Sequence, residues 1–212
     1  FIFCFVPGSG KSYLLSKVEK ALKDSLEKQI CIIREPVNLF QNYKGNDPLE
    51  LVYKNPHRNA FFSQEHIIEA VLQHAFPKIQ QTKASLVLFE RGLYSPSVFT
   101  KTLAELGYLQ QHEKDKLINL VESGIQHAQL PPLGAHKVFF LKTPPEVCLQ
   151  RIVARNRKGE DYITFAYLLE LERQYIHYLE DLKKTHGNQS VKVVDYSHPD
   201  IQQILIDFVH HE

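Results

Sequence analysis

FIFCFVPGSGKS, residues 1–12, is the stretch of this chain that decides its fold. Its first six residues form a short continuous apolar run, which is typical of a strand buried on both faces of a parallel sheet. Residues 8–12, GSGKS, come next, and between residues 12 and 29 apolar side chains recur at helical spacing. A buried strand, a glycine-rich turn and an amphipathic helix in this order are the context that a phosphate-binding loop requires.

The residues of this turn have the chemistry that a nucleoside triphosphate requires. Gly8, Ser9 and Gly10 let backbone N–H groups point at phosphate oxygens, and the helix N-terminus adds the positive end of its dipole. Lys11 is predicted to reach the β- and γ-phosphates, and Ser12 to ligate Mg²⁺. The pattern therefore indicates ATP or a related triphosphate, used with Mg²⁺. A glycine-rich turn that carries an exposed lysine is the alternative.

One position departs from the usual pattern of such loops, GxxxxGK[ST]. Phe5 stands where that pattern has its first glycine, and a bulky side chain does not easily adopt a left-handed backbone conformation. Two outcomes are expected. Either the loop has an altered shape and binds triphosphate more weakly, or the remaining glycines accommodate a small local shift.

Four further apolar runs repeat the strand pattern, at residues 30–33, 86–89, 138–141 and 191–194, with room for a helix between each and the next. Strands that alternate with helices predict a three-layer α/β fold, with a parallel sheet of five strands and helices on both faces. The longer helices are expected at residues 59–81, 97–129, 144–157 and 165–186. We expect a disturbance at Pro77 and breaks near Gly107 and Gly124.

Length, composition and charge narrow the class of protein. With 212 residues, 43% of them hydrophobic, the chain can bury one good core, and a single domain over residues 1–212 is expected. Its 25 Lys and Arg against 24 Asp and Glu produce no broad basic field, which argues against nucleic acid or a membrane as partner. No apolar run approaches the roughly 20 residues that a membrane helix needs.

The beginning of the chain bears on its location in the cell. Phe1 already lies within a strand pattern, and the chain contains no Met. We therefore expect that the natural N-terminus has been trimmed away, so that a targeting peptide is neither visible nor excluded. A cytoplasmic location is expected, and a mitochondrial one stays open.

Charged side chains follow two of the predicted strands directly. Glu35 comes shortly after the second apolar run and Glu90-Arg91 after the third, so they are expected at the carboxyl edge of the sheet, where open α/β sheets bind ligands. Glu35 can accept the proton of an attacking hydroxyl. Arg91 can hold Glu35 or a phosphate, and Glu90 can join the Mg²⁺ shell. A helix-start acid and a structural salt bridge are the alternatives.

A third charged cluster lies late in the chain. Arg151 and Arg155 are four residues apart and share a helical face, and Arg157 precedes the polar stretch KGED at residues 158–161. Residues 151–161 can close as a basic lid over a triphosphate, where they exclude water and neutralise the transferring group. A solvated face of arginines is the alternative.

Together these motifs resemble the deoxynucleoside kinases, cellular and viral, which include deoxycytidine, deoxyguanosine and mitochondrial thymidine kinases. The resemblance spans nearly the whole chain. It rests on GSGKS, EPV at residues 35–37, LELVYKNP at 49–56, Gln64, Glu90-Arg91 and RIVARNRKGE at 151–160. It implies a P-loop kinase fold, transfer of the γ-phosphoryl group of ATP to the 5′-hydroxyl of a small-molecule deoxynucleoside, and a homodimer.

The resemblance also implies roles for residues at matching positions. Glu35 would be the general base, with Arg91 beside it. Tyr53 and Glu160 would hold the 3′-hydroxyl of the sugar. Three arginines match those of the mobile lid, namely Arg151, Arg155 and Arg157.

In the base pocket the chain departs from the family. Gln64 matches the glutamine whose side-chain amide pairs with the base, a role that suits an amide because it both donates and accepts hydrogen bonds. Phe99 matches the aromatic wall of the pocket. Ser63 stands where the family usually has a phenylalanine against the base, and Phe62 is the candidate to substitute by a small shift. The segment GLYSPSVF, residues 92–99, is one residue shorter than in the family.

Two positions of this pocket favour thymidine. Deoxycytidine kinases carry an arginine seven residues after the glutamine and an aspartate six residues after the glutamate of the Glu-Arg pair, whereas this chain has Val71 and Pro96. Neither can form the charged pair that crowds the 5-methyl group of thymine, so a small apolar pocket should bury that methyl. The shorter segment can bring Ser95 or Ser97 to this place without adding charge. We expect thymidine to be preferred, followed by deoxycytidine.

Two other functions stay open on the sequence alone. Residues 34–36, Arg-Glu-Pro, also resemble a segment of thymidylate kinases in which the arginine binds the phosphate of the substrate. Against that family stand LELVYKNP and the spacing of eleven residues from Tyr53 to Gln64. A nucleotide-binding module without turnover would fit Phe5 and the altered base pocket, although the charged residues expected for catalysis are all present.

Overall fold

The computed structural model describes residues 1–25, 30–40, 43, 45–84, 86–127, 137–196, 202, 203 and 206. In this part of the chain the strands are β1 (Ile2–Cys4), β2 (Ile30–Ile33), β3 (Leu86–Glu90), β4 (Val138–Lys142) and β5 (Val191–Asp195). The α-helices are α1 (Lys11–Ser25), α2 (Val37–Phe40), α3 (Pro48–Lys54), α4 (Pro56–Gln81), α5 (Ser95–Glu105), α6 (Gln111–His127), α7 (Pro145–Arg155) and α8 (Phe165–His186). Short 3-10 helices are η2 (Glu160–Tyr162) and η3 (Asn188–Ser190).

The described strands form one sheet in the order β2-β3-β1-β4-β5, and every pair is parallel. Ile33 of β2 lies beside Phe89 of β3, and Phe3 of β1 beside Glu90. The residues that follow β1, β2 and β3 therefore lie together at one edge of the sheet. The predicted parallel sheet of five strands is confirmed.

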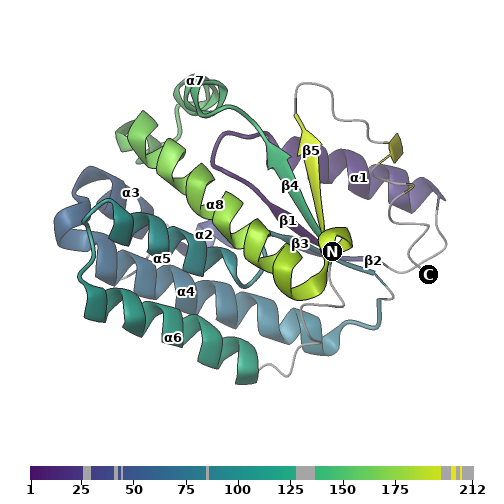
Figure 1. The fold of residues 1–212 in the computed structure, drawn as a ribbon, viewed down its shortest axis with the longest axis horizontal. Helices are drawn as coiled ribbons and strands as arrows, with labels where there is room; N and C mark the ends of the chain where they lie inside the picture. Colours follow the sequence, from purple (N-terminus) through teal and green to yellow (C-terminus); the bar gives the residue numbers. More distant parts are fainter. Residues whose placement is uncertain are drawn as a thin grey trace.

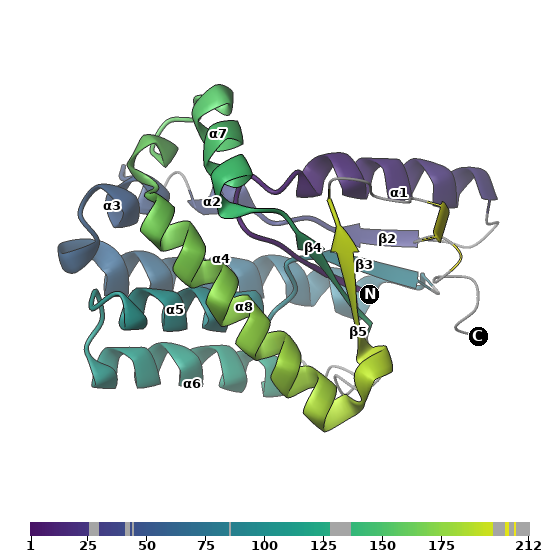
Figure 2. The same ribbon diagram turned by 45° about the horizontal axis from the view of Figure 1, so that its top comes forward.

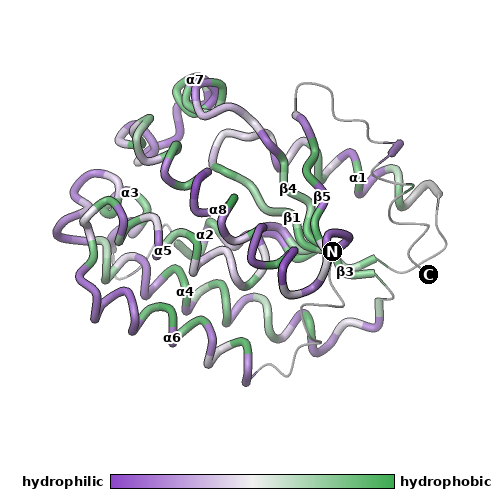
Figure 3. Tube along the Cα trace, in the orientation of Figure 1, coloured by the Kyte–Doolittle hydropathy of each residue, from purple (hydrophilic) through white to green (hydrophobic). Residues whose placement is uncertain are grey.

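Helices cover both faces of the sheet (Figures 1 and 2). Side chains alternate along β1, so that Phe3 packs on one face against α1, whereas Ile2 and Cys4 pack on the other with residues of α4, α5 and α8. Burial on both faces explains the apolar runs of the inner strands β1 and β4, which Figure 3 shows as hydrophobic stretches through the centre of the molecule. The edge strand β5 departs from this pattern, because it contains Lys192 and an exposed Val193. α6 packs outside this layer, on α4 and α5.

The expected disturbance at Pro77 was wrong, because α4 continues through this residue to Gln81. A proline inside a helix leaves the carbonyl four residues earlier without its N–H partner, here the carbonyl of Gln73. Pro77 and Gln73 are both exposed, so water can satisfy the freed oxygen. The helix therefore needs no internal replacement for the lost hydrogen bond.

The two predicted glycine breaks have different outcomes. Gly107 lies between α5 and α6 with φ of +75°, as expected for a break. α6, however, continues through Gly124 to His127. A Cβ at Gly124 would lie 2.5 Å from Cδ1 of Leu72 in α4, so this glycine permits close packing of the two helices.

The remaining elements follow the sequence patterns with small differences. The helix expected over residues 12–29 is α1 as far as Ser25, and residues 26–29 lie outside the described part of the chain, as do residues 128 and 129. The helices expected at 144–157 and 165–186 are α7 and α8. The short helices α2 and α3 were not predicted. None of the helices described here is both long and apolar enough to cross a membrane.

Candidate active site

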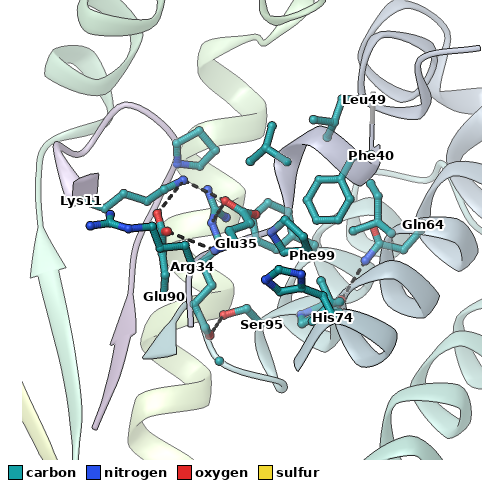
Figure 4. Close-up of a pocket in the computed structure, with 18 of the residues that line it drawn as sticks. Lys11, Arg34, Glu35, Phe40, Leu49, Gln64, His74, Glu90, Ser95 and Phe99 are labelled. Atoms are coloured by element: carbon teal, nitrogen blue, oxygen red, sulfur yellow. Dashed lines mark hydrogen bonds and ion pairs between the residues drawn. The ribbon is translucent and has the colours of Figure 1, made fainter. Parts of the chain in front are cut away.

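A pocket opens where β1, β2 and β3 end, with about 970 Å³ of empty space that is partly open to solvent. Charged residues that follow the strands line one end, and side chains of α4 and α5 line the other (Figure 4). Most of the predicted site residues line it: Lys11, Glu35, Tyr53, Gln64, Val71, Glu90, Arg91, Phe99, Arg155, Arg157 and Glu160. The others belong to the phosphate-binding loop or contact it, namely Gly8, Ser9, Gly10, Ser12 and Arg151.

The phosphate-binding loop turns on two glycines. Gly8 and Gly10 have φ values of +82° and +96°, which favour glycine. A Cβ at Gly8 would also lie 2.3 Å from the carbonyl oxygen of Cys148 in α7. Because α1 begins at Lys11, the N–H groups of Lys11 and Ser12 have no acceptor in a preceding turn, whereas that of Tyr13 donates to the Gly10 carbonyl. The two N–H groups offer an anion-binding end.

Phe5 does not itself adopt a left-handed backbone conformation. Its side chain is fully buried in the core beneath α1, with its ring stacked on Phe3 at 5.9 Å between centroids. Among the described residues other than glycine, only Arg91 and Asn156 have a positive φ. The aromatic side chain is therefore accommodated by the core, and the turn itself is made by the later glycines.

Four charged side chains meet where the loop approaches the ends of β2 and β3 (Figure 4). Lys11 Nζ lies 2.9 Å from Glu35 Oε2 and 3.8 Å from Glu90 Oε1. Arg91 Nε lies 3.0 Å from the same oxygen of Glu35. The N–H of Glu35 donates to Glu90 Oε2 at 3.1 Å. The charges predicted from the strand ends thus come together, because β2 and β3 are neighbours in the sheet.

The pKa values in this cluster reflect a balance of burial and charge. Burial raises the pKa of Glu35, but Arg91 and then Lys11 outweigh it and lower that pKa to about 2. The pKa of Lys11 is lowered, first by burial and then by Arg91, against the pull of the two carboxylates. Burial lowers the pKa of Arg91, yet the attraction of Glu35 keeps it above its usual value. Glu35 is therefore an ionised group shared between two cations.

Arg91 has an unusual backbone conformation, with φ of +68°, and Gly92 follows with +67°. Its N–H donates to the Phe3 carbonyl at 2.7 Å, and its carbonyl accepts a hydrogen bond from the Ser95 hydroxyl. Its guanidinium lies 4.8 Å from the centroid of the Phe99 ring. Nη1 is buried and has no hydrogen-bond partner within the described residues. This nitrogen is available to an oxygen of a bound molecule.

The predicted sugar-binding residues lie at the lid side of the pocket. Glu160 accepts hydrogen bonds from Arg155 Nη2 and, at 3.3 Å, from Arg157 Nη1. The ring of Tyr53 meets that of Tyr167 edge-on at 5.4 Å. Burial raises the pKa of Tyr53 to about 12, so its hydroxyl keeps its proton and can donate a hydrogen bond.

Arg151 is separated from the other two arginines of the predicted lid. Its Nη1 donates to the Ser9 carbonyl at 3.2 Å, and its guanidinium lies 4.0 Å from the centroid of the Tyr196 ring. Tyr196 in turn lies against the loop, because a Cβ at Gly10 would be 2.7 Å from its Cε2. Arg151 therefore supports the phosphate-binding loop, whereas Arg155 and Arg157 line the pocket.

α4 presents one face to the far end of the pocket, through Gln64, Ile67, Val71, His74 and Ala75. These positions recur at helical spacing. Gln64 Nε2 donates to the Pro96 carbonyl at 3.0 Å. Figure 4 shows Gln64, Phe99 and His74 on the side of the pocket away from Lys11 and Glu90. This end is mainly apolar, with an amide as its main polar group.

Phe62 does not replace the phenylalanine that the family places against the base. Its side chain is 41% exposed and packs on the ring of Tyr43 at 5.6 Å, outside the lining of the pocket. Ser63 is fully buried, and it does not line the pocket either. The aromatic residue that α2 contributes to this region is Phe40, which is 1% exposed.

Two polar pocket residues were not singled out from the sequence. His74 Nε2 lies 2.9 Å from Lys78 Nζ, and the pKa of His74 is lowered, first by burial and then by that lysine. Tyr167 of α8 lines the pocket beside Tyr53, and burial raises its pKa. Both occupy ordinary helix positions. The only signal that could have identified them is their helical spacing from other residues that face the pocket.

Arg34, the residue on which a thymidylate kinase would rely, also lines the pocket. Its guanidinium donates to Glu19 Oε2 of α1 at 2.7 Å. A phosphate on the substrate would therefore compete with an existing ion pair for this group.

The residues beside the loop fit Mg²⁺ held together with phosphates. This ion prefers oxygen ligands and is commonly held by one or two carboxylates, phosphate oxygens and waters. Glu90 offers a buried carboxylate, and Ser12 a hydroxyl in the first turn of α1. Within the described residues, no group of three or more His, Cys, Asp or Glu could hold a metal ion. The chemistry of their oxygen atoms makes Glu90 and Ser12 the candidates.

A model of the deoxynucleoside kinase family matches residues 7–208, and the chain belongs to this family. The resemblance inferred from the motifs is therefore confirmed. Among curated relatives, the deoxyadenosine kinase of Dictyostelium discoideum is 28% identical over 145 residues, which are 68% of this chain and 57% of that protein. The thymidine kinase of Ictalurid herpesvirus 1 (strain Auburn) is 25% identical over 187 residues, which are 86% and 76%.

The chain spans between 54% and 61% of the length of the first three curated relatives that it matches. Among solved structures, deoxyadenosine kinase from M. mycoides with bound dATP has a TM-score of 0.73 at 21% identity, and 98% of each chain is covered. The same enzyme with dCMP and dCDP has a TM-score of 0.75 at 20% identity, with 100% of this chain and 98% of that one covered. This likeness confirms the fold.

Proposed function

We propose that the chain transfers the γ-phosphoryl group of ATP or a related triphosphate to the 5′-hydroxyl of a deoxynucleoside. The observation that carries the proposal is the Glu35 carboxylate, which lies between Lys11 and Arg91 at 2.9 and 3.0 Å. It stands at the junction of the phosphate-binding loop and the pocket. A hydroxyl that enters the pocket beside Glu35 would approach the terminal phosphate, and this proximity is the main requirement of phosphoryl transfer.

Glu35 would accept the proton of the attacking hydroxyl. With a pKa of about 2 it is a weak base while both cations hold it. A triphosphate that draws Lys11 to its β- and γ-phosphates removes one of these cations, so the pKa of Glu35 rises toward its usual value. Arg91 remains and keeps the carboxylate in place. Donor binding would thereby activate the base.

The lid would supply further charge. Arg155 and Arg157 are bound to Glu160 in this structure. If they move to the phosphates, they neutralise charge on the transferring group and leave Glu160 to join Tyr53 at the 3′-hydroxyl of the sugar. Ser12 and Glu90 would hold Mg²⁺, which when bound neutralises charge on the phosphates.

For the acceptor we propose a preference for thymidine, followed by deoxycytidine. Val71 and Pro96 both line the pocket, and Pro96 presents its carbonyl to Gln64. Ser95 brings no free hydroxyl, because it donates to Arg91, and Ser97 is outside the lining. A buried methyl group contributes about 0.8 kcal/mol, so thymidine should exceed deoxyuridine roughly fourfold in kcat/KM. Relatives named thymidine kinases are among those that the chain matches, beside others named deoxyadenosine, deoxyguanosine and deoxycytidine kinases.

A substrate panel tests the proposal. It contains the four deoxynucleosides and thymidylate, each with ATP and Mg²⁺, and thymidine should have the highest kcat/KM. A highest value for deoxyadenosine or deoxyguanosine would overturn the pocket argument and leave the kinase assignment intact. Phosphorylation of thymidylate alone would indicate a monophosphate kinase, and no turnover at all a nucleotide-binding module. The family resemblance also predicts a homodimer, which light scattering after size-exclusion chromatography measures.

A further inference from the structure

The backbone at Arg91 is strained, and something must hold it. Residues with a side chain rarely adopt a positive φ, yet Arg91 has +68° at the turn between β3 and α5. Such conformations persist only where the surrounding structure imposes them. Here the conformation directs the guanidinium back toward Glu35.

The carbonyl of Arg91 is held by two buried side chains. The Ser95 hydroxyl donates to this oxygen, and the Cys4 thiol contacts it at 3.9 Å. Ser95 is 2% exposed and Cys4 is 1% exposed. Because water has little access to these contacts, each of them depends on its protein partner.

Tyr175 of α8 completes this chain of hydrogen bonds. Its hydroxyl donates to Ser95 Oγ at 3.2 Å. Ser95 uses its own proton on Arg91, so its oxygen is free to accept the proton of Tyr175. Tyr175 is fully buried, and burial raises its pKa, so the hydroxyl stays a donor. Two hydrogen bonds in series therefore run from α8 to the Arg91 carbonyl.

The ring of Tyr175 reaches the other end of the same arginine. It meets the ring of Phe99 edge-on, at 6.3 Å between centroids and 88° between planes. Phe99 in turn lies 4.8 Å below the Arg91 guanidinium. Tyr175 thus supports the backbone of Arg91 through Ser95 and its side chain through Phe99, although it does not itself line the pocket that the structure describes.

From these two routes we propose that Tyr175 is a positioning residue for the phosphoryl transfer, holding Arg91 where it meets Glu35. This inference rests on the proposed function. Tyr175→Phe keeps the ring and removes the hydroxyl. It should lower kcat for thymidine about tenfold, because a small displacement of a group beside the reacting atoms is costly, and should leave KM within about twofold. Ser95→Ala, which breaks the same path, should give a similar loss.

Tyr178→Phe is the matched control. Tyr178 lies three residues further along α8, is partly buried, and makes no hydrogen bond through its hydroxyl to any described residue. The kcat of the Tyr178→Phe variant should equal that of the wild type. Thermal unfolding of both variants shows whether Tyr175→Phe loses activity beyond any loss of stability. If that variant does not fold, Ser95→Ala carries the test.

A double-mutant cycle separates positioning from a merely structural role. In an Arg91→Ala background, Tyr175→Phe should cause no further loss of kcat, because the residue acts through Arg91. A further loss of about tenfold, or a Tyr175→Phe enzyme as active as the control, would overturn the inference while wild-type activity upholds the proposed function. A wild-type chain that phosphorylates no deoxynucleoside would overturn the proposed function, and the inference with it.

Discussion

The two ends of the pocket are built from different parts of the fold. Lys11, Glu35, Glu90 and Arg91 follow the ends of strands or open a helix, and ion pairs and backbone hydrogen bonds hold them. The other end is a set of helix faces with apolar side chains and the Gln64 amide. On the proposed function, the charged end would carry out the phosphoryl transfer for any acceptor, whereas the helix faces would select which base is bound.

Removal of the Lys11 side chain should cause the largest loss of turnover, and the loss should be the same for every nucleoside substrate. Lys11→Ala is expected to lower kcat at least about 1,000-fold with thymidine and deoxycytidine alike, because the β- and γ-phosphates lose their cation. Lys17→Ala, at an exposed lysine of the same helix, is the control. Steady-state kinetics with both nucleosides measure the effect. Turnover close to wild type would mean that the loop does not hold the donor.

Loss of the carboxylate at position 35 should be the next largest effect. Glu35→Gln keeps the shape but cannot accept a proton, so kcat is expected to fall about 100-fold while the KM for thymidine changes within about threefold. Glu65→Gln on α4, which removes a surface partner of Lys116, should leave both constants unchanged. Equal losses in kcat and in nucleoside binding would make Glu35 a binding residue.

Tyr53 lies between the two ends and should discriminate by sugar. Tyr53→Phe is expected to lower kcat/KM for thymidine about tenfold, the cost of one unmade hydrogen bond in a buried site. The variant should leave 3′-deoxythymidine unaffected, since this substrate has no 3′-hydroxyl. Competition assays with the two nucleosides provide the comparison. An equal loss for both would remove Tyr53 from the sugar site.

A substitution at the helix end of the pocket should alter the preference between two nucleosides rather than the turnover number. Val71→Ala removes part of the wall expected to cover the 5-methyl group, so the preference for thymidine over deoxyuridine should fall about threefold with little change in kcat. Leu72→Ala is the control, since Leu72 packs against Gly124 of α6, outside the pocket. It should lower the Tm and keep the ratio. A ratio that falls in both variants would point to loosening of α4.

The smallest expected effect is on stability at low pH. The pKa of Glu35 lies at about 2, below its usual value of 4.5. A depressed carboxylate pKa stabilises the folded state above the unfolded pKa, and this contribution is lost as the pH falls through the folded pKa. The Tm advantage of the wild type over Glu35→Gln should thus be full at pH 7 and shrink between pH 4.5 and 2. Calorimetry at pH 7 and pH 3 measures the difference.

The charged end of the pocket could be predicted from the sequence because its residues lie next to clear patterns, namely the apolar strand runs and the glycine-rich loop. Glu35, Glu90 and Arg91 come at or just after apolar strands, and a parallel sheet brings such positions to one edge. The helix end was less accessible. In the sequence, His74 and Tyr167 look like ordinary helix residues until the neighbouring helices are placed.

The errors along the helices have the same origin. Local propensity predicted a disturbance at Pro77 and a break at Gly124. Tertiary structure decided otherwise, because Pro77 lies on a solvated side of α4 and Gly124 admits Leu72. Phe62 was the candidate to take the place of the family's phenylalanine by a small shift. Its position on the outer side of α4 cannot be deduced without knowing where Tyr43 lies.

The single pocket-facing stripe of α4 has an evolutionary consequence. The residues of this stripe lie along one face of a single helix and line the pocket, namely Gln64, Ile67, Val71, His74 and Ala75. On the proposed function, a point mutation at one of these positions would change the preferred acceptor without disturbing the strand-end charges. Gene copies could therefore diverge in substrate while inheriting their chemistry intact. Such independence fits a family whose relatives bear the names of deoxyadenosine, deoxyguanosine, deoxycytidine and thymidine kinases.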